Sequence, residues 1–111
     1  MTPNWYEQSL KNHIKFLDTA QAQGRLITRE ERSCFLALAI SGEAGELANL
    51  YKKLWRGDGV DVEEFGQKVR MEVADIYTYL RHLSDELGFD LDDAAEEKAA
   101  IVEKRLQASS C

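Results

Sequence analysis

Apolar residues return every three or four positions along almost the whole chain, and this helical period limits the fold more than any other feature. The only proline stands at position 3, so no later segment is interrupted by one. No segment alternates apolar and polar residues in the way a half-buried strand does. The sequence therefore predicts an all-α fold, whose helices are separated by glycines and capping residues.

Capping residues and glycines divide the chain into four helices. Thr2 reads as an N-cap before Pro3, Thr28 opens a capping box, and Asp61 and Asp90 begin the later segments. A glycine follows each of the first three segments with helical apolar spacing, as is usual after a helix C-terminus. We therefore expect one domain over residues 1–111, resembling a four-helix bundle, with helices at approximately 3–23, 29–56, 62–87 and 91–108.

The composition restricts the class of partner. The chain has 20 acidic and 14 basic residues, and its formal charge of −6 argues against a protein that grips a nucleic-acid backbone. A nucleotide remains compatible, because a divalent cation can reverse the sign of a local acidic cluster. No apolar stretch approaches the roughly 18 residues of a membrane span, and the N-terminus does not resemble a signal peptide. We expect a soluble, cytoplasmic protein that binds neither nucleic acid nor membrane.

The second helix is apolar on more than one side. Its main stripe is widened near the start by Cys34, Phe35 and Leu38. A helix that is apolar beyond one stripe has to be covered on more than one side, so self-association is expected. The cysteines, Cys34 and Cys111, fit neither a disulfide framework nor a zinc motif. We interpret Cys34 as a small buried residue and Cys111 as part of a frayed terminus.

Acidic residues interrupt the apolar stripes of the two middle helices at equivalent places. Glu43 and Glu72 each occupy a stripe position, and Glu46 and Asp75 follow three residues later on nearly the same face. The stripe residues are Leu36, Ile40, Leu47, Leu50 and Leu54 around the first acid, and Phe65, Val69, Ile76, Leu80, Leu83 and Leu87 around the second. Ionised carboxylates without partners would cost several kcal/mol each at such positions. A bound cation, raised pKa values or buried basic partners must compensate.

The ligand chemistry of this acidic group favours Mg²⁺, Mn²⁺ or Ca²⁺ over zinc or copper, because all the donors are oxygen atoms. A di-iron bundle would use Glu-x-x-His, whereas His13 and His82 lie outside both acidic pairs and suit packing or the surface. The alternative is that the acids lie at the edges of the stripes and pair with lysine or arginine. The sequence leaves this alternative open.

Five further residues suit a nucleotide substrate. Lys98 and Arg105 share one helix face and match the needs of a phosphate tail, and Lys53 belongs to another basic cluster. Tyr79 lies one turn beyond the second acidic pair, and Trp55 can stack on a base. Solvated charges, salt bridges and aromatic packing are the simpler roles for these same residues.

The run Glu43-Ala-Gly-Glu46, 25 intervening residues and Glu72-Val-Ala-Asp75-Ile resembles the E-x-x-E … E-x-x-D signature of the MazG family of all-α NTP pyrophosphatases. The likeness extends over roughly residues 33–106. It implies that the four acids are catalytic and hold Mg²⁺, with Mn²⁺ as a substitute. It also implies hydrolysis of an NTP or dNTP to the monophosphate and pyrophosphate, and a homodimer or homotetramer with active sites near the subunit contacts.

The helix after the acidic pairs departs from the family pattern at one place. Members often carry K-x-x-x-N-x-x-R there; Lys98 and Arg105 match it, but Val102 replaces the asparagine. Base and sugar preference therefore cannot be carried over, although a single domain is most similar to the short, dCTPase-like house-cleaning forms. Either Glu43 or Glu46 can orient the attacking water. The other hypotheses are a non-catalytic dimerisation or regulatory module and a nucleotide or metal sensor.

Overall fold

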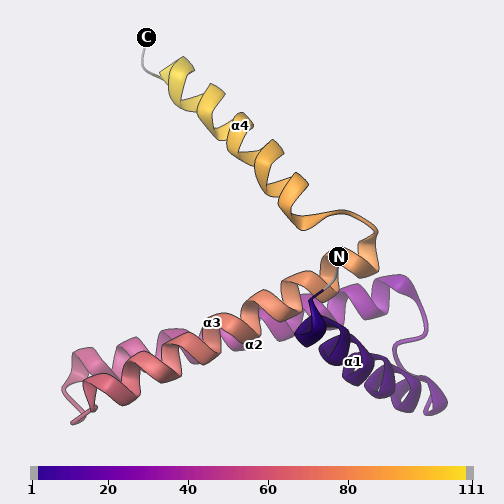
Figure 1. Cartoon of the computed structure of the whole chain (residues 1–111), viewed down its shortest axis with the longest axis horizontal. Coiled ribbons are helices and arrows are strands. Elements are labelled where there is room, and N and C mark those ends of the chain that lie inside the picture. Colours follow the sequence, from indigo (N-terminus) through magenta and orange to yellow (C-terminus); the bar gives the residue numbers. More distant parts are fainter. Residues whose placement is uncertain (1–2, 110–111) are drawn as a thin grey trace.

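Four helices account for nearly all of the chain in a computed structural model, which describes residues 3–109 (Figure 1). They are α1 (Asn4–Ala22), α2 (Arg29–Arg56), α3 (Val62–Leu87) and α4 (Leu91–Ser109). The all-α class expected from the sequence is confirmed, and every helix boundary agrees with its expected position within one residue. Thr2 and Cys111 lie outside the described residues.

Local capping chemistry explains where the long helices begin and end. The Thr28 hydroxyl accepts a hydrogen bond from the Glu31 backbone N–H at 3.1 Å, and the Glu31 carboxylate accepts one from the Thr28 N–H at 3.0 Å. The Asp61 carboxylate caps α3 in a similar way. Gly57 and Gly88 end α2 and α3 with φ values of 78° and 77°, a left-handed conformation that other residues adopt at a cost.

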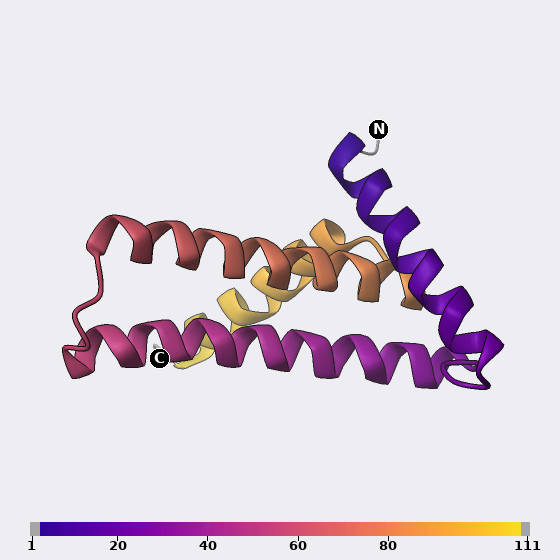
Figure 2. The same ribbon diagram turned by 90° about the horizontal axis from the view of Figure 1, so that it is seen from below.

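The antiparallel pair α2–α3 is the centre of the molecule (Figure 1). Helix α1 crosses one side of this hairpin near the end where α2 begins and α3 ends, and α4 leaves from the same end on the opposite side (Figure 2). Helix α4 contacts only α3, near the turn that joins them. The four helices therefore do not close into the expected bundle within one chain, since α4 does not pack along the hairpin.

The chain has little interior of its own. Its buried apolar residues, among those described, are Tyr6, Ala20 and Leu36. The radius of gyration is 17.9 Å, against about 13 Å for a compact domain of this length. Cys34 is exposed, contrary to expectation, because its side of α2 faces away from α3 and nothing else covers it. Within the described residues, no helix combines the length and hydropathy that crossing a bilayer requires.

Candidate functional site

Packing of α2 against α3 brings three of the four expected carboxylates together. Ligand oxygens of Glu43, Glu46 and Glu72 lie within 4.8 Å of one another. The two helices meet along their apolar stripes, so an acid at a stripe position on each one must face the other helix. Oxygens that share a Mg²⁺ ion, with bonds of about 2.1 Å, lie roughly 3–4 Å apart. Small side-chain adjustments would therefore allow these three groups to share one cation.

Asp75 borders this group without joining it. It is exposed, lies one turn beyond Glu72 on α3, and lines a cavity on the α1 side of the hairpin. Its negative charge still reaches the cluster, since it helps to raise the pKa of both Glu43 and Tyr79. The structure thus divides the four acids into a set of three and a neighbour that faces the cavity.

The clustered carboxylates lack a partner of opposite charge. Glu43 and Glu72 can hydrogen bond to each other only when one of them is protonated, and this raises the pKa of Glu43 to about 7, with further contributions from burial and from the charges of Glu46, Asp75 and Glu72. When both are ionised, their buried Oε2 atoms have no hydrogen-bond partner. A divalent cation would replace the proton and supply the missing partner for both oxygens. The donor set therefore fits a hard cation such as Mg²⁺ or Mn²⁺.

The alternative pairing of these acids with basic side chains is not what the structure shows. Over residues 3–109 the ion pairs are Arg32–Glu86, Arg56–Asp58 and Lys68–Glu64, at 2.5, 2.5 and 3.1 Å. None of them includes a member of the cluster. The compensation for the clustered acids must therefore come from protons or from a group outside the described chain.

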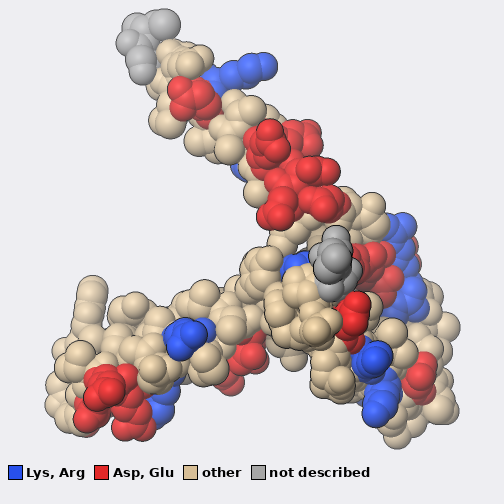
Figure 3. Space-filling model, in the orientation of Figure 1, with Lys and Arg blue, Asp and Glu red and all other residues tan. Residues whose placement is uncertain are grey.

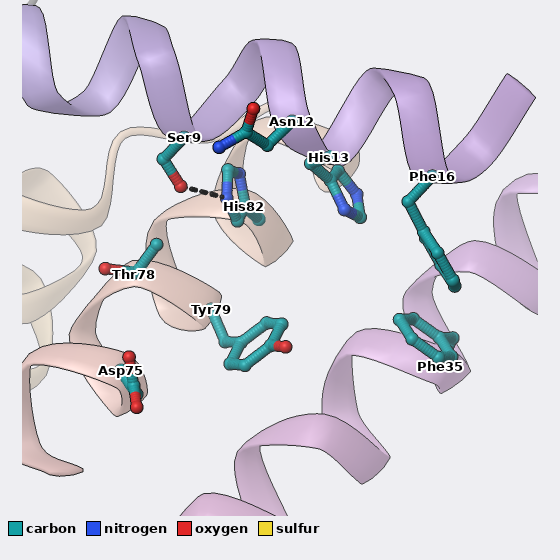
Figure 4. A pocket seen from close by; sticks show the side chains of 9 residues that line it. All are labelled: Ser9, Asn12, His13, Phe16, Phe35, Asp75, Thr78, Tyr79 and His82. Carbon is teal, nitrogen blue, oxygen red and sulfur yellow. Dashed lines mark hydrogen bonds between the residues drawn. The ribbon is translucent and has the colours of Figure 1, made fainter.

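A cavity of about 350 Å³ opens beside Asp75, between α1 and the hairpin (Figure 4). Phe16 and Phe35 stack at 5.0 Å between their ring centres and form its aromatic end, while Ser9 and Asn12 of α1 line another part of it. Tyr79 lies between the aromatic end and Asp75. The remaining lining residues are His13, Thr78 and His82. An apolar cavity with a few polar groups and one acidic end has the character of a small-molecule site.

Contacts between α1 and α3 hold the α1 wall of the cavity in place. The buried Tyr6 hydroxyl donates a hydrogen bond to Asp85, and it lies 3.4 Å from Nδ1 of His82. Ser9 is hydrogen bonded to Nε2 of His82 at 3.0 Å. Since the Tyr6 proton is used by Asp85, His82 carries its proton on Nδ1 and accepts from Ser9 at Nε2. The α1 wall is therefore attached by a specific polar network as well as by packing.

The two histidines are packing residues in this network. The rings of His13 and His82 stack with centroids 4.7 Å apart, and His82 is only 5% exposed. Burial, together with the neighbouring His13, lowers the pKa of His82 to about 4, and burial also lowers the pKa of His13. Both imidazoles are therefore neutral at pH 7. This agrees with the packing role that the sequence suggested for them.

Four expected substrate residues lie away from the carboxylates of their own chain. Lys53 lines a separate groove near Asp58, and the Trp55 side chain is 86% exposed on the face of the hairpin opposite α1. Lys98 and Arg105 lie on α4, which leaves the hairpin on that same opposite side (Figures 1 and 2). Of the five expected substrate residues, only Tyr79 reaches the cavity beside Asp75.

The α1 residues of the cavity were not anticipated from the sequence. Ser9, Asn12, His13 and Phe16 follow the spacing i, i+3, i+4 and i+7, which places them on one helix face. That spacing was the available signal, but the mixed polarity of these residues hides it in a search for apolar stripes. No protein-family model matches the chain, and neither curated proteins nor solved structures provide a match.

Proposed function

We propose that this protein hydrolyses a nucleoside or deoxynucleoside triphosphate to the monophosphate and pyrophosphate, with Mg²⁺ as cofactor. The observation that carries the proposal is the cluster of Glu43, Glu46 and Glu72, in which buried oxygens of Glu43 and Glu72 lack partners, next to a cavity that suits a nucleoside. The E-x-x-E … E-x-x-D resemblance to the MazG family agrees with this assignment.

Each acid has a role that follows from its position. Glu43 and Glu72 are the more buried members and would hold the cation, and Asp75, which borders the cluster at the cavity, would join them after a side-chain movement. Glu46 is exposed, so its carboxylate is free to accept a proton from the water that attacks the α-phosphorus. When bound, Mg²⁺ or Mn²⁺ neutralises phosphate charge and lowers the pKa of water. The reaction consumes one water and divides the triphosphate between its α- and β-phosphates.

The substrate orientation follows from the contents of the cavity. The base lies between the aromatic end at Phe16 and Phe35 and the polar groups of α1, and the phosphates extend past Asp75 to the carboxylates. Such an arrangement separates a recognition region from a reaction region. We place the activity in cytoplasmic house-cleaning of the nucleotide pool.

The assembly proposed for the enzyme is a homodimer or homotetramer. The four-helix bundle that one chain leaves open would then be closed by helices of a second copy. The exposed apolar residues Leu38, Trp55 and Val62, at 68, 86 and 78% exposure, support this assignment. The same surfaces would serve a non-catalytic dimerisation module, which is the second candidate function.

An activity screen separates these candidates. Purified protein is incubated with each NTP and dNTP and Mg²⁺, and pyrophosphate and orthophosphate are measured separately. We expect pyrophosphate, lost on addition of EDTA and in the variants Glu46→Ala and Asp75→Ala. Glu97→Ala, which removes an exposed acid of α4, is the matched control and should retain activity.

Each other outcome identifies a different function. Absence of turnover with every nucleotide would overturn the enzyme assignment. If Mg²⁺ and a nucleotide nevertheless raise the melting temperature, the protein is a sensor. If neither changes it, the dimerisation module stands.

A further inference from the structure

Ser9 differs from the other helical hydroxyl residues in its hydrogen bonding. A serine or threonine inside a helix commonly bonds to a carbonyl oxygen of the preceding turn. Five hydroxyls within residues 3–109 do so, those of Thr19, Ser33, Thr78, Ser84 and Ser109. Ser9 instead bonds to Nε2 of His82, on another helix, at 3.0 Å (Figure 4). Its hydroxyl is therefore paired with a base.

A chain of hydrogen bonds continues from this pair to a carboxylate. Ser9 directs its proton at Nε2 of His82, and Nδ1 of the same ring lies 3.4 Å from the Tyr6 hydroxyl. Tyr6 in turn donates its proton to Asp85. Nucleophile, base and carboxylate thus follow one another as in a catalytic triad, with a tyrosine between the last two. The chain fixes the ring so that Nε2 is presented to Ser9.

The Ser9 oxygen is accessible from the cavity beside α1. Ser9 is half-buried and lines this space of about 350 Å³, whereas His82 behind it is only 5% exposed. Since the Ser9 proton is directed at His82, the lone pairs of the oxygen are left for a molecule in the cavity. A bound molecule can therefore meet the hydroxyl while the base stays shielded from water.

Asn12 supplies a hydrogen-bond donor next to Ser9. It lies three residues later on the same face of α1, and it lines the same cavity. Its Oδ1 accepts a hydrogen bond from Nε2 of Gln8 at 3.2 Å, which orients the amide so that its nitrogen is the group offered to a ligand (Figure 4). A side-chain amide in such a place can stabilise the negative oxygen of a tetrahedral intermediate.

We propose that Ser9 is the nucleophile of a second activity, the hydrolysis of small uncharged esters, with His82 as general base and Asn12 as donor to the oxyanion. These three residues form one side of the cavity. None of them belongs to the carboxylate cluster. The second activity therefore does not rest on the proposed nucleotide hydrolysis.

The surroundings of Ser9 define the class of ester. Stacked Phe16 and Phe35 give the cavity an aromatic end that suits an apolar or aryl group. The carboxylate of Asp75 lies at the cavity as well and disfavours an anionic substrate. Acidic residues outnumber basic ones by 20 to 14 in the whole chain, and they form a patch near the start of α4 in Figure 3. An uncharged ester is not repelled by this surface.

The reaction needs only the ester and water. The Ser9 oxygen bonds to the carbonyl carbon, its proton passes to Nε2 of His82, and the carbonyl oxygen takes the negative charge beside Asn12. The bond from carbon to the alcohol oxygen then breaks, and the alcohol leaves with the proton from Nε2. Water attacks the acyl group in the same manner, which releases the acid and restores the Ser9 hydroxyl and the neutral imidazole. The sum is ester and water to acid and alcohol.

The groups around His82 keep its imidazole unprotonated and ready to accept. Burial and the neighbouring His13 lower the pKa of His82 to about 4, and Arg81 lowers it further, whereas Asp85 raises it. The negative charge of Asp85 also favours the imidazolium that forms during attack. Hydrolysis should therefore depend little on pH above about 5 and should fall at lower pH, as the base becomes protonated.

The first experiment measures release of nitrophenol from p-nitrophenyl acetate by the full chain in the presence of EDTA. We expect turnover by the unmodified protein and only the rate of buffer for Ser9→Ala and His82→Gln. Asn12→Ala should lower kcat/KM by about 100-fold. Ser33→Ala, which removes a hydroxyl bonded to its own helix, is the matched control and should retain the rate. Equal rates for Ser9→Ala and the unmodified protein would overturn the proposal.

A covalent label tests the nucleophile without a variant that could fail to fold. Diisopropyl fluorophosphate forms a bond between an activated serine oxygen and phosphorus and releases hydrogen fluoride. We expect one adduct in the intact mass of the native protein, located on Ser9 by peptide mapping and absent from heat-denatured protein. An adduct on another residue, or equal labelling of native and denatured protein, would contradict activation of Ser9 by the fold.

The carboxylate variants separate this activity from the proposed nucleotide hydrolysis. Glu46→Ala and EDTA should both leave ester hydrolysis unchanged, because neither alters the Ser9–His82 pair. Loss of ester hydrolysis under either condition would overturn the assignment to Ser9. A protein that hydrolyses nucleotides but no ester, and takes no label, would refute this inference alone. A protein that hydrolyses the ester through Ser9 but turns over no nucleotide would refute the proposed function alone.

Discussion

Helices α1 and α4 are each 19 residues long and join the same end of the α2–α3 hairpin, but only α1 buries side chains against it. Tyr6 and Ala20 bury α1 at two points, and the contacts of Ser9 and Phe16 add to them. Helix α4 has no buried residue. Aromatic side chains on α1 provide large contact areas within the chain, whereas α4 offers alanines, short apolar groups and charges. The difference shows that α1 is fixed by contacts with the rest of the chain, whereas α4 buries no side chain against it.

Among the variants proposed, removal of the Tyr6 ring should most strongly weaken the packing of α1 on the hairpin. Tyr6→Ala empties a nearly fully buried position and removes the hydrogen bond to Asp85. We expect a loss of about 3–4 kcal/mol in the free energy of unfolding, measured in urea. Tyr6→Phe should lose only about 1 kcal/mol, since it keeps the ring. Equal losses in the two variants would show that packing does not attach α1.

Low pH should weaken the contact of α1 with α3, because His82 becomes protonated. The folded-state pKa of about 4 lies below the ordinary value of 6.5, so the unfolded state binds the proton first. Stability is therefore full above pH 6.5 and is lost as the pH falls toward 4, at up to about 1.4 kcal/mol per pH unit. At pH 5 the loss should be about 2 kcal/mol.

The fluorescence of Trp5 reports this release, because its ring lies 6.1 Å from that of Tyr77 across the α1–α3 contact. The measurement uses Trp55→Phe, which removes the other tryptophan signal. His82→Gln in the same background should make the signal less dependent on pH between 7 and 5, and the remaining dependence should come from His13, whose pKa is also lowered by burial. An unchanged transition in that variant would assign the effect to another group.

The carboxylate cluster should respond to pH in the opposite direction. The folded-state pKa of Glu43 is raised to about 7 from 4.5. Its contribution to the free energy of unfolding is therefore fully present below pH 4.5 and is lost as the pH rises through 7. Glu43→Gln should therefore stabilise the metal-free protein at pH 8 by about 1 kcal/mol, a value reduced for solvent screening. Mg²⁺ should raise the melting temperature of the unmodified protein and not that of the variant. Destabilisation at pH 8 would contradict this description of the cluster.

The smallest effect should come from α4. Ile101→Ala should change the stability of dilute, monomeric protein by less than about 0.5 kcal/mol, because the side chain is 40% exposed and touches no core. If the chain forms the proposed homodimer and buries this side chain in it, the same variant should lose about 1 kcal/mol at concentrations where the dimer forms. Urea unfolding at two protein concentrations measures both values. A loss that does not depend on concentration would mean that α4 packs within its own chain.

The sequence predicted the parts of the fold that depend on local chemistry. Thr28, Gly57 and Gly88 set helix ends through hydrogen bonds and left-handed backbone within a few residues of each end. The meeting of Glu43 with Glu72 followed from the phases of two long apolar stripes, which leave one way to pack. Such features can be derived without knowledge of distant contacts.

The direction of α4 and the α1 cavity depend on contacts that no local pattern encodes. A turn of three residues after Leu87 permits many directions for α4, and the chain supplies no anchor that selects one. The face of α1 that packs on the hairpin could not be predicted from apolar spacing, because it carries the polar residues Ser9 and Asn12 beside aromatic ones. Cys34 was expected to be buried because α2 is apolar over more than one stripe, but its side of α2 faces away from α3 and is exposed.

The proton that Glu43 retains near neutrality makes cation uptake an exchange reaction. A cation that enters the cluster must displace this proton, so its apparent affinity rises with pH up to about 7 and levels off above that value. The heat of binding then includes the ionisation heat of whichever buffer accepts the proton. Acidification would therefore lower occupancy of the site by the cation, and the cluster would couple cation binding to the proton concentration of its surroundings.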